Sequence, residues 1–158
     1  MKKHEIPYVM QRLQTLPGQP MTAVGYAADM LTLGFGWAGE AALHIQCSYR
    51  MATEDTILFD RIDYFIDEEP DNRLFNAVHK LQGQLDGMTV ASVDVNQLGD
   101  LTIRFAGGAT LLALAMRSDD DECWRFWNDD LWPDQHMVVY GDHVELHGPG
   151  DGCCGICE

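Results

Sequence analysis

GQPMTAVGYAADMLTLGFGWAGEAALHIQCSYR, residues 18–50, has a second and diverged copy in GMTVASVDVNQLGDLTIRFAGGATLLALAMR, residues 87–117. The two segments match along their length at an offset near 69 residues. The matched pairs are Gly18 with Gly87, Val24 with Val93, Leu31-Thr32-Leu33 with Leu101-Thr102-Ile103, Phe35 with Phe105, Leu43 with Leu112, Ile45 with Leu114, and approximately Arg50 with Arg117. The repeat indicates two halves with the same local structure.

Each copy predicts a meander of three antiparallel strands. Turn residues separate the strands, with Asp29 or Gly99-Asp100 in the first turn and glycines in the second. In Leu43–Cys47, apolar and polar residues alternate, so Cys47 is predicted to be a small core residue.

An acidic turn and a further apolar segment follow each meander. These segments are TILFDRIDYFI, residues 56–66, and ECWRFWN, residues 122–128. Each predicts a fourth strand, so the copies cover about 18–66 and 87–128.

Two further elements complete the predicted fold. The segment between the copies has apolar residues at helical spacing and predicts one amphipathic helix over about 70–84. MVVYGDHVELHG, residues 137–148, predicts a terminal hairpin. The expected class is α+β, mainly antiparallel β, with two repeated meanders related by a pseudo-twofold axis. We expect one domain over 1–147 and a Gly/Cys-rich tail over 148–158.

Negative charge is concentrated near the C-terminus. The formal net charge is −15, and residues 118–158 carry eleven acids against one base, Arg125. The acids are Asp119, Asp120, Asp121, Glu122, Asp129, Asp130, Asp134, Asp142, Glu145, Asp151 and Glu158. Such a field repels nucleic acid and anionic membranes and accelerates encounter with a basic protein. The alternative is a solvated face that maintains solubility.

Composition and absent motifs narrow the class of protein. No run approaches the roughly 18 apolar residues that cross a bilayer. Five cysteines, an odd number, do not form the paired framework of a small secreted domain. We therefore expect a cytoplasmic protein with reduced thiols. The chain has no phosphate loop, nucleophile elbow or HExxH motif, which disfavours the common nucleotide-binding and hydrolase classes.

Aromatic residues surround the one C-terminal arginine. Strand alternation places Trp124 and Phe126 on one face and Arg125 and Trp127 on the other. One face is core, and the other is either core or an aromatic and arginine patch of the kind enriched at protein interfaces. The predicted partner-binding residues are Asp119, Asp120, Asp121, Glu122, Arg125, Trp127, Asp129, Asp130 and Trp132.

Potential metal ligands lie near the C-terminus. On a strand, His143, Glu145 and His147 share a face, and two imidazoles with a carboxylate suit zinc or iron. Cys154 and Cys157 form a C-x-x-C pair, a common half of a zinc site. The alternatives stay open, because alternation alone explains the strand, and a disulfide between adjacent cysteines or a plain chain end explains the tail.

The second half carries a pattern over residues 85–147. It consists of a glycine before the first strand, Gly99-Asp100-Leu101 at the second strand, a glycine turn, a third strand, Glu-x-Trp-Arg at 122–125 and Val-Val-x-Gly at 138–141. In this pattern the chain resembles small bacterial proteins of uncharacterised function, and it resembles immunity proteins of bacterial toxin systems in size and type. The resemblance implies a binding protein and supplies no catalytic residues.

Three hypotheses of function follow. The first is a non-enzymatic module whose acidic C-terminal third docks a basic protein, as an immunity protein docks a nuclease toxin. The second is a metal-dependent protein that uses the 143–147 strand or the cysteines. The third is an oligomer in which exposed meander edges pair between subunits.

Overall fold

The computed structural model of the chain describes residues 1–66, 72–116 and 121–148, and the backbone of 154–155. Its helices are α1 (Glu5–Leu13), the 3-10 helix η1 (Arg61–Phe65) and α2 (Arg73–Gln82). Its strands are β1 (Met21–Ala27), β2 (Met30–Phe35), β3 (Ala41–Ile45), β4 (Ser48–Ala52), β5 (Ile57–Asp60), β6 (Val90–Val95), β7 (Leu101–Phe105), β8 (Thr110–Leu114), β9 (Glu122–Asn128), β10 (His136–Tyr140), β11 (Val144–His147) and β12 (Cys154–Gly155).

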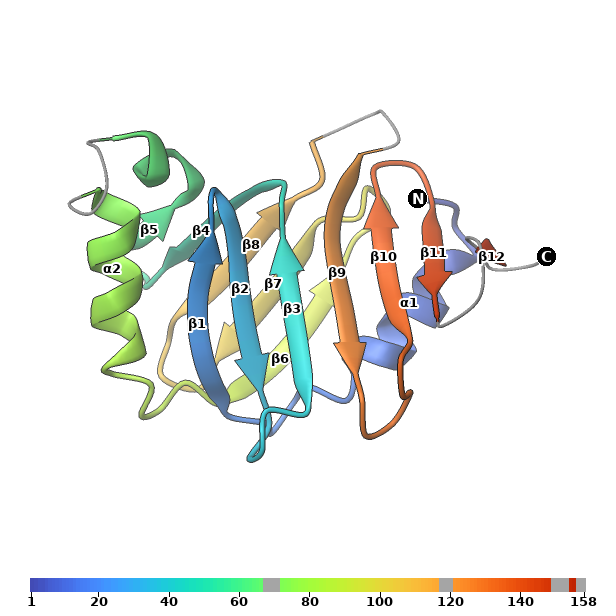
Figure 1. The fold of residues 1–158 in the computed structure, drawn as a ribbon, viewed down its shortest axis with the longest axis horizontal. Coiled ribbons are helices and arrows are strands. Elements are labelled where there is room, and N and C mark those ends of the chain that lie inside the picture. The colour runs from blue at the N-terminus through green and yellow to red at the C-terminus, as the bar shows by residue number, and fades with distance from the viewer. Residues whose placement is uncertain (67–71, 117–120, 149–153, 156–158) are drawn as a thin grey trace.

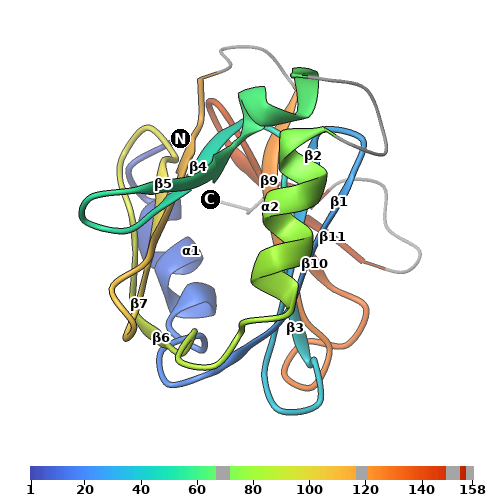
Figure 2. The same cartoon turned by 90° about the vertical axis from the view of Figure 1, so that its left-hand side faces the viewer.

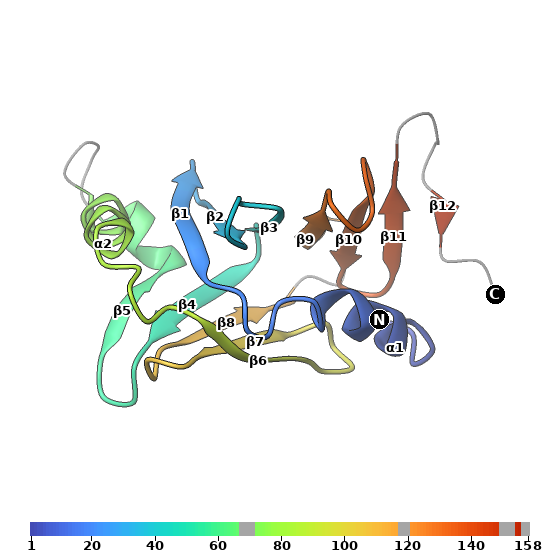
Figure 3. The ribbon, with the colours of Figure 1, turned by 90° about the horizontal axis from the view of Figure 1, so that it is seen from below.

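Two antiparallel sheets form two layers (Figure 1 and Figure 3). One sheet has the strand order β1-β2-β3-β9-β10-β11-β12, and the other has the order β5-β4-β8-β7-β6. The apolar faces of both sheets enclose one buried core. The predicted α+β class with mainly antiparallel strands is confirmed.

Both predicted meanders are present, as β1-β2-β3 and β6-β7-β8. The copies share their irregularities, because β1 and β6 each carry a register shift near the start, which in β1 lies between Met21 and Ala23. The segments that enter the two meanders meet at an isolated bridge between Pro20 and Thr89, residues 69 apart. Pro20 and Thr89 occupy equivalent positions in the two copies and contact each other, so the pseudo-twofold axis passes through this bridge.

The fourth strand of each copy joins the sheet of the other copy. β4 follows the first meander but pairs antiparallel with β8, and β9 follows the second meander but pairs with β3. One sheet therefore combines β1, β2 and β3 of the first half with β9 to β12 of the second, and the other combines β6, β7 and β8 of the second half with β4 and β5 of the first (Figure 1). The two halves hold each other through two strand pairings of the same kind.

The position of the first copy's fourth strand was wrongly predicted. This strand is Ser48–Ala52, which directly follows the third strand. The segment 56–66 instead forms β5 and then η1. Asp60 ends the strand and caps the 3-10 helix, because its carboxylate accepts hydrogen bonds from the backbone of Ile62 and Asp63.

The predicted alignment of the third strands was also wrong. The buried partners are Leu43 opposite Leu33 and Leu111 opposite Ile103, so Leu43 corresponds to Leu111 rather than Leu112. The first copy has two more turn residues than the second at this point, a difference that sequence matching had underestimated. By the corrected register, Ile45 of the first copy corresponds to Ala113 instead of Leu114 of the second. Arg50 likewise corresponds to Arg125 instead of Arg117.

Two helices lie at opposite ends of the layers (Figure 2 and Figure 3). α2 confirms the predicted linker helix, and the Asn72 side chain caps its first turn by accepting from the Phe75 N–H at 2.7 Å. α1 was not predicted, so the expectation of one helix is wrong. Val9 and Leu13 have helical spacing, but the charged residue Arg12 shares the buried face and interrupts the apolar stripe. In the described residues, no helix is long and apolar enough to cross a membrane.

Two aromatic side chains tie the layers together across the core. The fully buried indole of Trp124 on β9 donates a hydrogen bond of 2.8 Å to the Gly99 carbonyl. The Tyr49 hydroxyl on β4 donates one of 3.1 Å to the Asp29 carbonyl. Each side chain thus starts on a fourth strand in one sheet and reaches the first turn of its own meander in the other sheet.

The terminal hairpin is confirmed, because β10 and β11 pair antiparallel. β12 then pairs with β11, which places the backbone of Cys154 opposite Leu146. The backbone at 154–155 therefore returns to the hairpin. Cys47 is buried, as predicted, and its amide donates to the carbonyl of the second buried cysteine, Cys123, at 3.0 Å.

Candidate functional site

β9 carries the predicted aromatic residues and lies between β3 and β10. Trp124 and Phe126 are fully buried, whereas Arg125 and Trp127 are partly exposed and lie on the outer face of the sheet. The alternation predicted for this strand is confirmed. None of the described helices or strands covers this outer face (Figure 1 and Figure 3).

A line of rings crosses this face from strand to strand. Trp127 contacts His44 of β3 edge to face, with ring centroids 4.6 Å apart, and stacks on His136 of β10 at 4.7 Å. His147 of β11 lies directly opposite His136. We call His44, Trp127, His136 and His147 the imidazole row.

Two members of the imidazole row, His44 and His136, were not predicted as site residues. Alternation within residues 43–47 already placed His44 on the face away from the core. The pairing of β3 with β9 could not be predicted from the sequence, because it joins the two halves of the chain. His136 precedes the apolar run of the hairpin and could have been found from the same alternation.

The arginine of this face is neutralised by a neighbour on its own strand. Arg125 Nε donates to Glu122 Oε1 at 2.7 Å, and a second bond joins Nη2 to Oε2. A bidentate pair of this kind is geometrically specific. The one base of the acidic C-terminal segment is thus paired and contributes little net positive charge to the face.

Exposed acids lie at both ends of these strands. Asp129 and Asp130 are in the connection from β9 to β10, together with Asp134, and Asp142 is in the turn before β11. Asp121 precedes β9 and is also exposed. The predicted residues Asp119 and Asp120 fall outside the described residues.

Trp132 does not lie on the outer face with Trp127. It is half-buried against the core, and the Arg12 guanidinium of α1 lies over its ring at 4.2 Å. The structure thus separates the predicted aromatic residues, with Arg125 and Trp127 on the outer face and Trp132 against a helix.

The predicted metal ligands on β11 and at His143, directly before it, contact one another. Glu145 Oε2 lies 2.9 Å from His147 Nε2, and Glu145 Oε1 lies 3.3 Å from His143 Nε2. Across the described residues, no group of three or more His, Cys, Asp or Glu side chains is disposed to hold a metal ion. The side chain of Cys154 and the whole of Cys157 lie outside the described residues.

Burial and charge perturb the histidines in opposite directions. Burial is the main cause that lowers the pKa of His44 and of His136; the charge of Arg125 lowers both further, and its partner Glu122 opposes this effect. For His143, burial alone would lower the pKa, but bonds to Asp142 and Glu145 outweigh it and raise the pKa. The lowered pKa values of His44 and His136 therefore favour the neutral form of these two imidazoles near pH 7.

We expect the variant His136→Gln to lose less stability on acidification than the wild-type chain. A folded-state pKa below 6.5 means that the unfolded chain takes up the proton first as the pH falls. The contribution of His136 is present above pH 6.5 and is lost below it. Thermal unfolding at pH 7.5 and 5.5 measures the difference, with His4→Gln at an exposed histidine as control. Equal losses in wild type and His136→Gln contradict the expectation.

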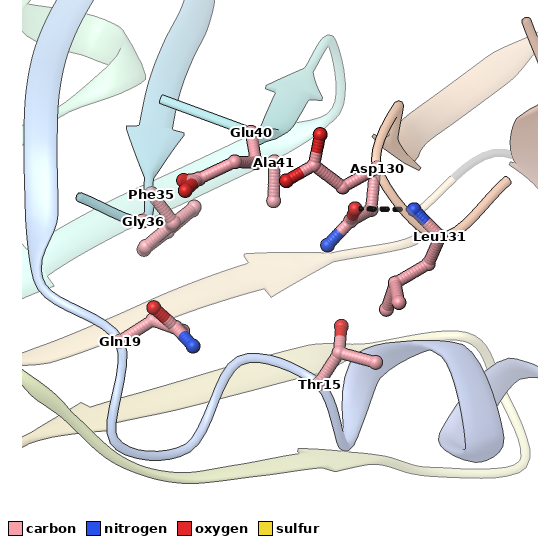
Figure 4. A pocket seen from close by; sticks show the side chains of 9 residues that line it. Thr15, Gln19, Phe35, Gly36, Glu40, Ala41, Asp130 and Leu131 are labelled. Carbon is pink, nitrogen blue, oxygen red and sulfur yellow. Dashed lines mark hydrogen bonds between the residues drawn. The ribbon is translucent and has the colours of Figure 1, made fainter. Parts of the chain in front are cut away.

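A small cavity of about 180 Å³ opens near the ends of β2 and β9 (Figure 4). Glu40 and Asp130 line it from two turns, and Thr15 and Gln19 approach from the segment after α1. The Glu40 carboxylate accepts from the Ala38 N–H at 3.2 Å, so it stabilises its own turn. The cavity adds acidic character beside the β9–β10 connection but has no catalytic arrangement.

Comparison with known proteins gives no match to a family model, to a curated protein or to a solved structure. The chemistry of the site is therefore the basis for assigning a function.

Proposed function

We propose that this chain is a non-enzymatic binding protein that holds a basic protein partner on the outer face of β3, β9, β10 and β11. The imidazole row carries this proposal, because it presents Trp127 between two rings on a sheet face left open by the described elements. Tryptophan is among the residues most enriched at interface hot spots. The particular form that we propose is an immunity protein that neutralises a basic toxin.

Electrostatics favour a basic partner over an acidic one. The chain has a formal net charge of −15, and exposed acids lie at both ends of the strands that carry the row. Arg125 is already paired with Glu122, so no unpaired arginine on this strand opposes the approach. Such an arrangement increases the association rate at low salt and disfavours nucleic acid as a ligand.

The row is also held in place before any partner arrives. Trp127 lies opposite Ala42 on one side and His136 on the other, in the interior of a sheet. Side chains that are fixed by neighbouring rings lose little conformational entropy on binding. The site can therefore contribute affinity without a rearrangement of the fold.

Trp127→Ala is expected to weaken partner binding by roughly 2 kcal/mol, about 30-fold, as for a hot-spot tryptophan. The partner is the basic protein that co-purifies with the chain from its source organism at low salt, produced separately and titrated by calorimetry. Trp37→Ala is the matched control, because Trp37 is 84% exposed in the turn between β2 and β3. We expect it to bind like wild type.

The salt dependence of partner affinity is the second test of this proposal. Affinity is expected to fall between 50 and 500 mM salt if acids steer and hold a basic surface. Failure to recover a stoichiometric basic partner, affinity indifferent to salt, or wild-type binding by Trp127→Ala contradicts the proposal.

A zinc site is the second candidate function, and one observation favours it. The tail backbone pairs with β11, the strand of Glu145 and His147, although its register sets Cys154 opposite Leu146, which faces the core rather than these two residues. A zinc site here gives one zinc per chain in protein purified without chelator, and the double variant Cys154→Ser, Cys157→Ser loses it. Wild-type protein without stoichiometric zinc removes this candidate.

A further inference from the structure

The strand β5 forms one edge of the five-stranded sheet, and the other sheet edges are covered or very short. At the β1 edge, the Val24 N–H donates to the Gln82 side chain of α2 at 2.7 Å. At the β6 edge, the Val90 N–H donates to the Gln19 carbonyl at 2.9 Å. The seven-stranded sheet ends in β12, which has two residues. The two meander edges that could have joined subunits are therefore already engaged.

The pseudo-twofold symmetry relates the position beside β5 to one that a strand occupies in the other sheet. β5 pairs with β4 and β10 pairs with β9, so β5 and β10 are counterparts in the two sheets. On its other side, β10 pairs antiparallel with β11, which buries Val144 beside α1. β5 has no second strand partner within the described residues. The position that β11 fills in one sheet is thus left open in the other.

A groove of about 510 Å³ lies at this position, between β5 and α2. Ile57 and Leu58 line it from the strand and are 56% and 37% exposed. Ala77 and Leu81 line it from the helix. Exposed apolar side chains on an edge strand form a template for an added strand. Figure 2 looks onto this end of the molecule, with α2 in front.

Two cations border the same groove in a strongly acidic chain. Arg73 and Lys80 lie two turns apart on the groove face of α2, and both are exposed. Neither forms an ion pair with an acid in the part of the chain that the structure describes. An occupant that carries acids therefore complements this groove, and a basic one does not.

We infer that β5 accepts an extended acidic segment of a partner protein as an added antiparallel strand. Backbone hydrogen bonds to the β5 edge would supply affinity, and alternate apolar side chains would pack on Ile57, Leu58 and Leu81. The acids of the segment would face Arg73 and Lys80. A second copy of this chain is a poorer occupant, because each copy carries a formal charge of −15. The β5 edge is a different surface from the imidazole row, so failure of one proposal does not affect the other.

The test uses two end-blocked synthetic peptides of seven residues, in which valine alternates with glutamate or with lysine. Titration into the whole protein is expected to show at least about tenfold tighter binding of the glutamate peptide. Lys80→Glu and Arg73→Glu are each expected to weaken that binding about tenfold. Arg104→Glu is the matched control, because Arg104 is an exposed arginine on β7 of the same sheet. It is expected to leave affinity within about twofold of wild type.

Hydrogen exchange locates the added strand. Binding of the glutamate peptide is expected to slow exchange of amides in residues 57–60, and Trp127→Ala is expected to bind it normally. The inference is overturned if neither peptide binds at 1 mM, if the lysine peptide binds equally well, or if protection appears elsewhere. It is also overturned if the free protein is a dimer that Leu58→Asp dissociates, because the edge is then occupied by a second copy.

Discussion

Replacing Trp124 by alanine is expected to lower the free energy of unfolding by about 3–5 kcal/mol. Trp124 is the largest fully buried side chain of the core. Its removal leaves a cavity between the layers and leaves the Gly99 carbonyl without the indole donor. The loss falls at the point where β9 joins the sheet of the other half, so we expect a cooperative loss of stability. Chemical denaturation monitored by far-UV circular dichroism measures it.

Two variants at other aromatic residues provide comparisons for Trp124→Ala. Tyr49→Phe removes the equivalent bond to Asp29 with almost no change in volume and is expected to cost about 0.5–1.5 kcal/mol. Trp37→Ala changes a tryptophan that is 84% exposed and is expected to stay within about 0.5 kcal/mol of wild type. A cost below about 1 kcal/mol for Trp124→Ala would show that the core does not depend on this side chain.

Sequence patterns predicted the parts of this fold that depend on near neighbours. The meanders, the linker helix and the terminal hairpin each follow from periodicity and turn residues within one short segment. The exchange of β4 and β9 between the halves could not be predicted, because a copy that kept its own fourth strand would show the same alternation. Long-range strand pairing depends on which faces fit together in three dimensions, and one sequence does not state this.

The same limit applies to the candidate site. Alternation alone was enough to place Arg125 and Trp127 on one face of a strand. It did not bring His44 and His136 to Trp127, because those contacts depend on the register of three strands from different parts of the chain. Trp132 lies near Trp127 in sequence, but a turn after β9 directs it to α1 instead.

α1 was not predicted because its buried face contains charged residues that the corresponding face of α2 lacks. The C-caps of the helices, Gln14 and Gly83, are 69 residues apart, the same offset as the bridge on the pseudo-twofold axis. At that offset, Arg12 takes the place of Leu81. Arg12 is only 5% exposed, and although its Nη2 donates to the Gln135 side chain at 2.8 Å, its buried Nη1 has no hydrogen-bond partner among the described residues.

Two substitutions of Arg12 are therefore expected to change stability in opposite directions. Arg12→Met keeps most of the volume over Trp132 and removes a desolvated charge, so we expect it to raise the free energy of unfolding by about 1–2 kcal/mol. Arg12→Ala removes the volume as well and is expected to lower it by about 2–4 kcal/mol.

Denaturation of both Arg12 variants beside wild type gives the comparison, and Lys3→Met, at an exposed residue before the helix, is the control for loss of charge alone. If Arg12→Met is less stable than wild type by more than about 1 kcal/mol, the contacts of the guanidinium with Tyr8 and Trp132 outweigh its desolvation. If it is more stable, this half of the repeat carries a cation that lowers stability at a position where the other half has leucine. Packing then explains the length of the Arg12 side chain, and its charge has to be explained by something other than folding.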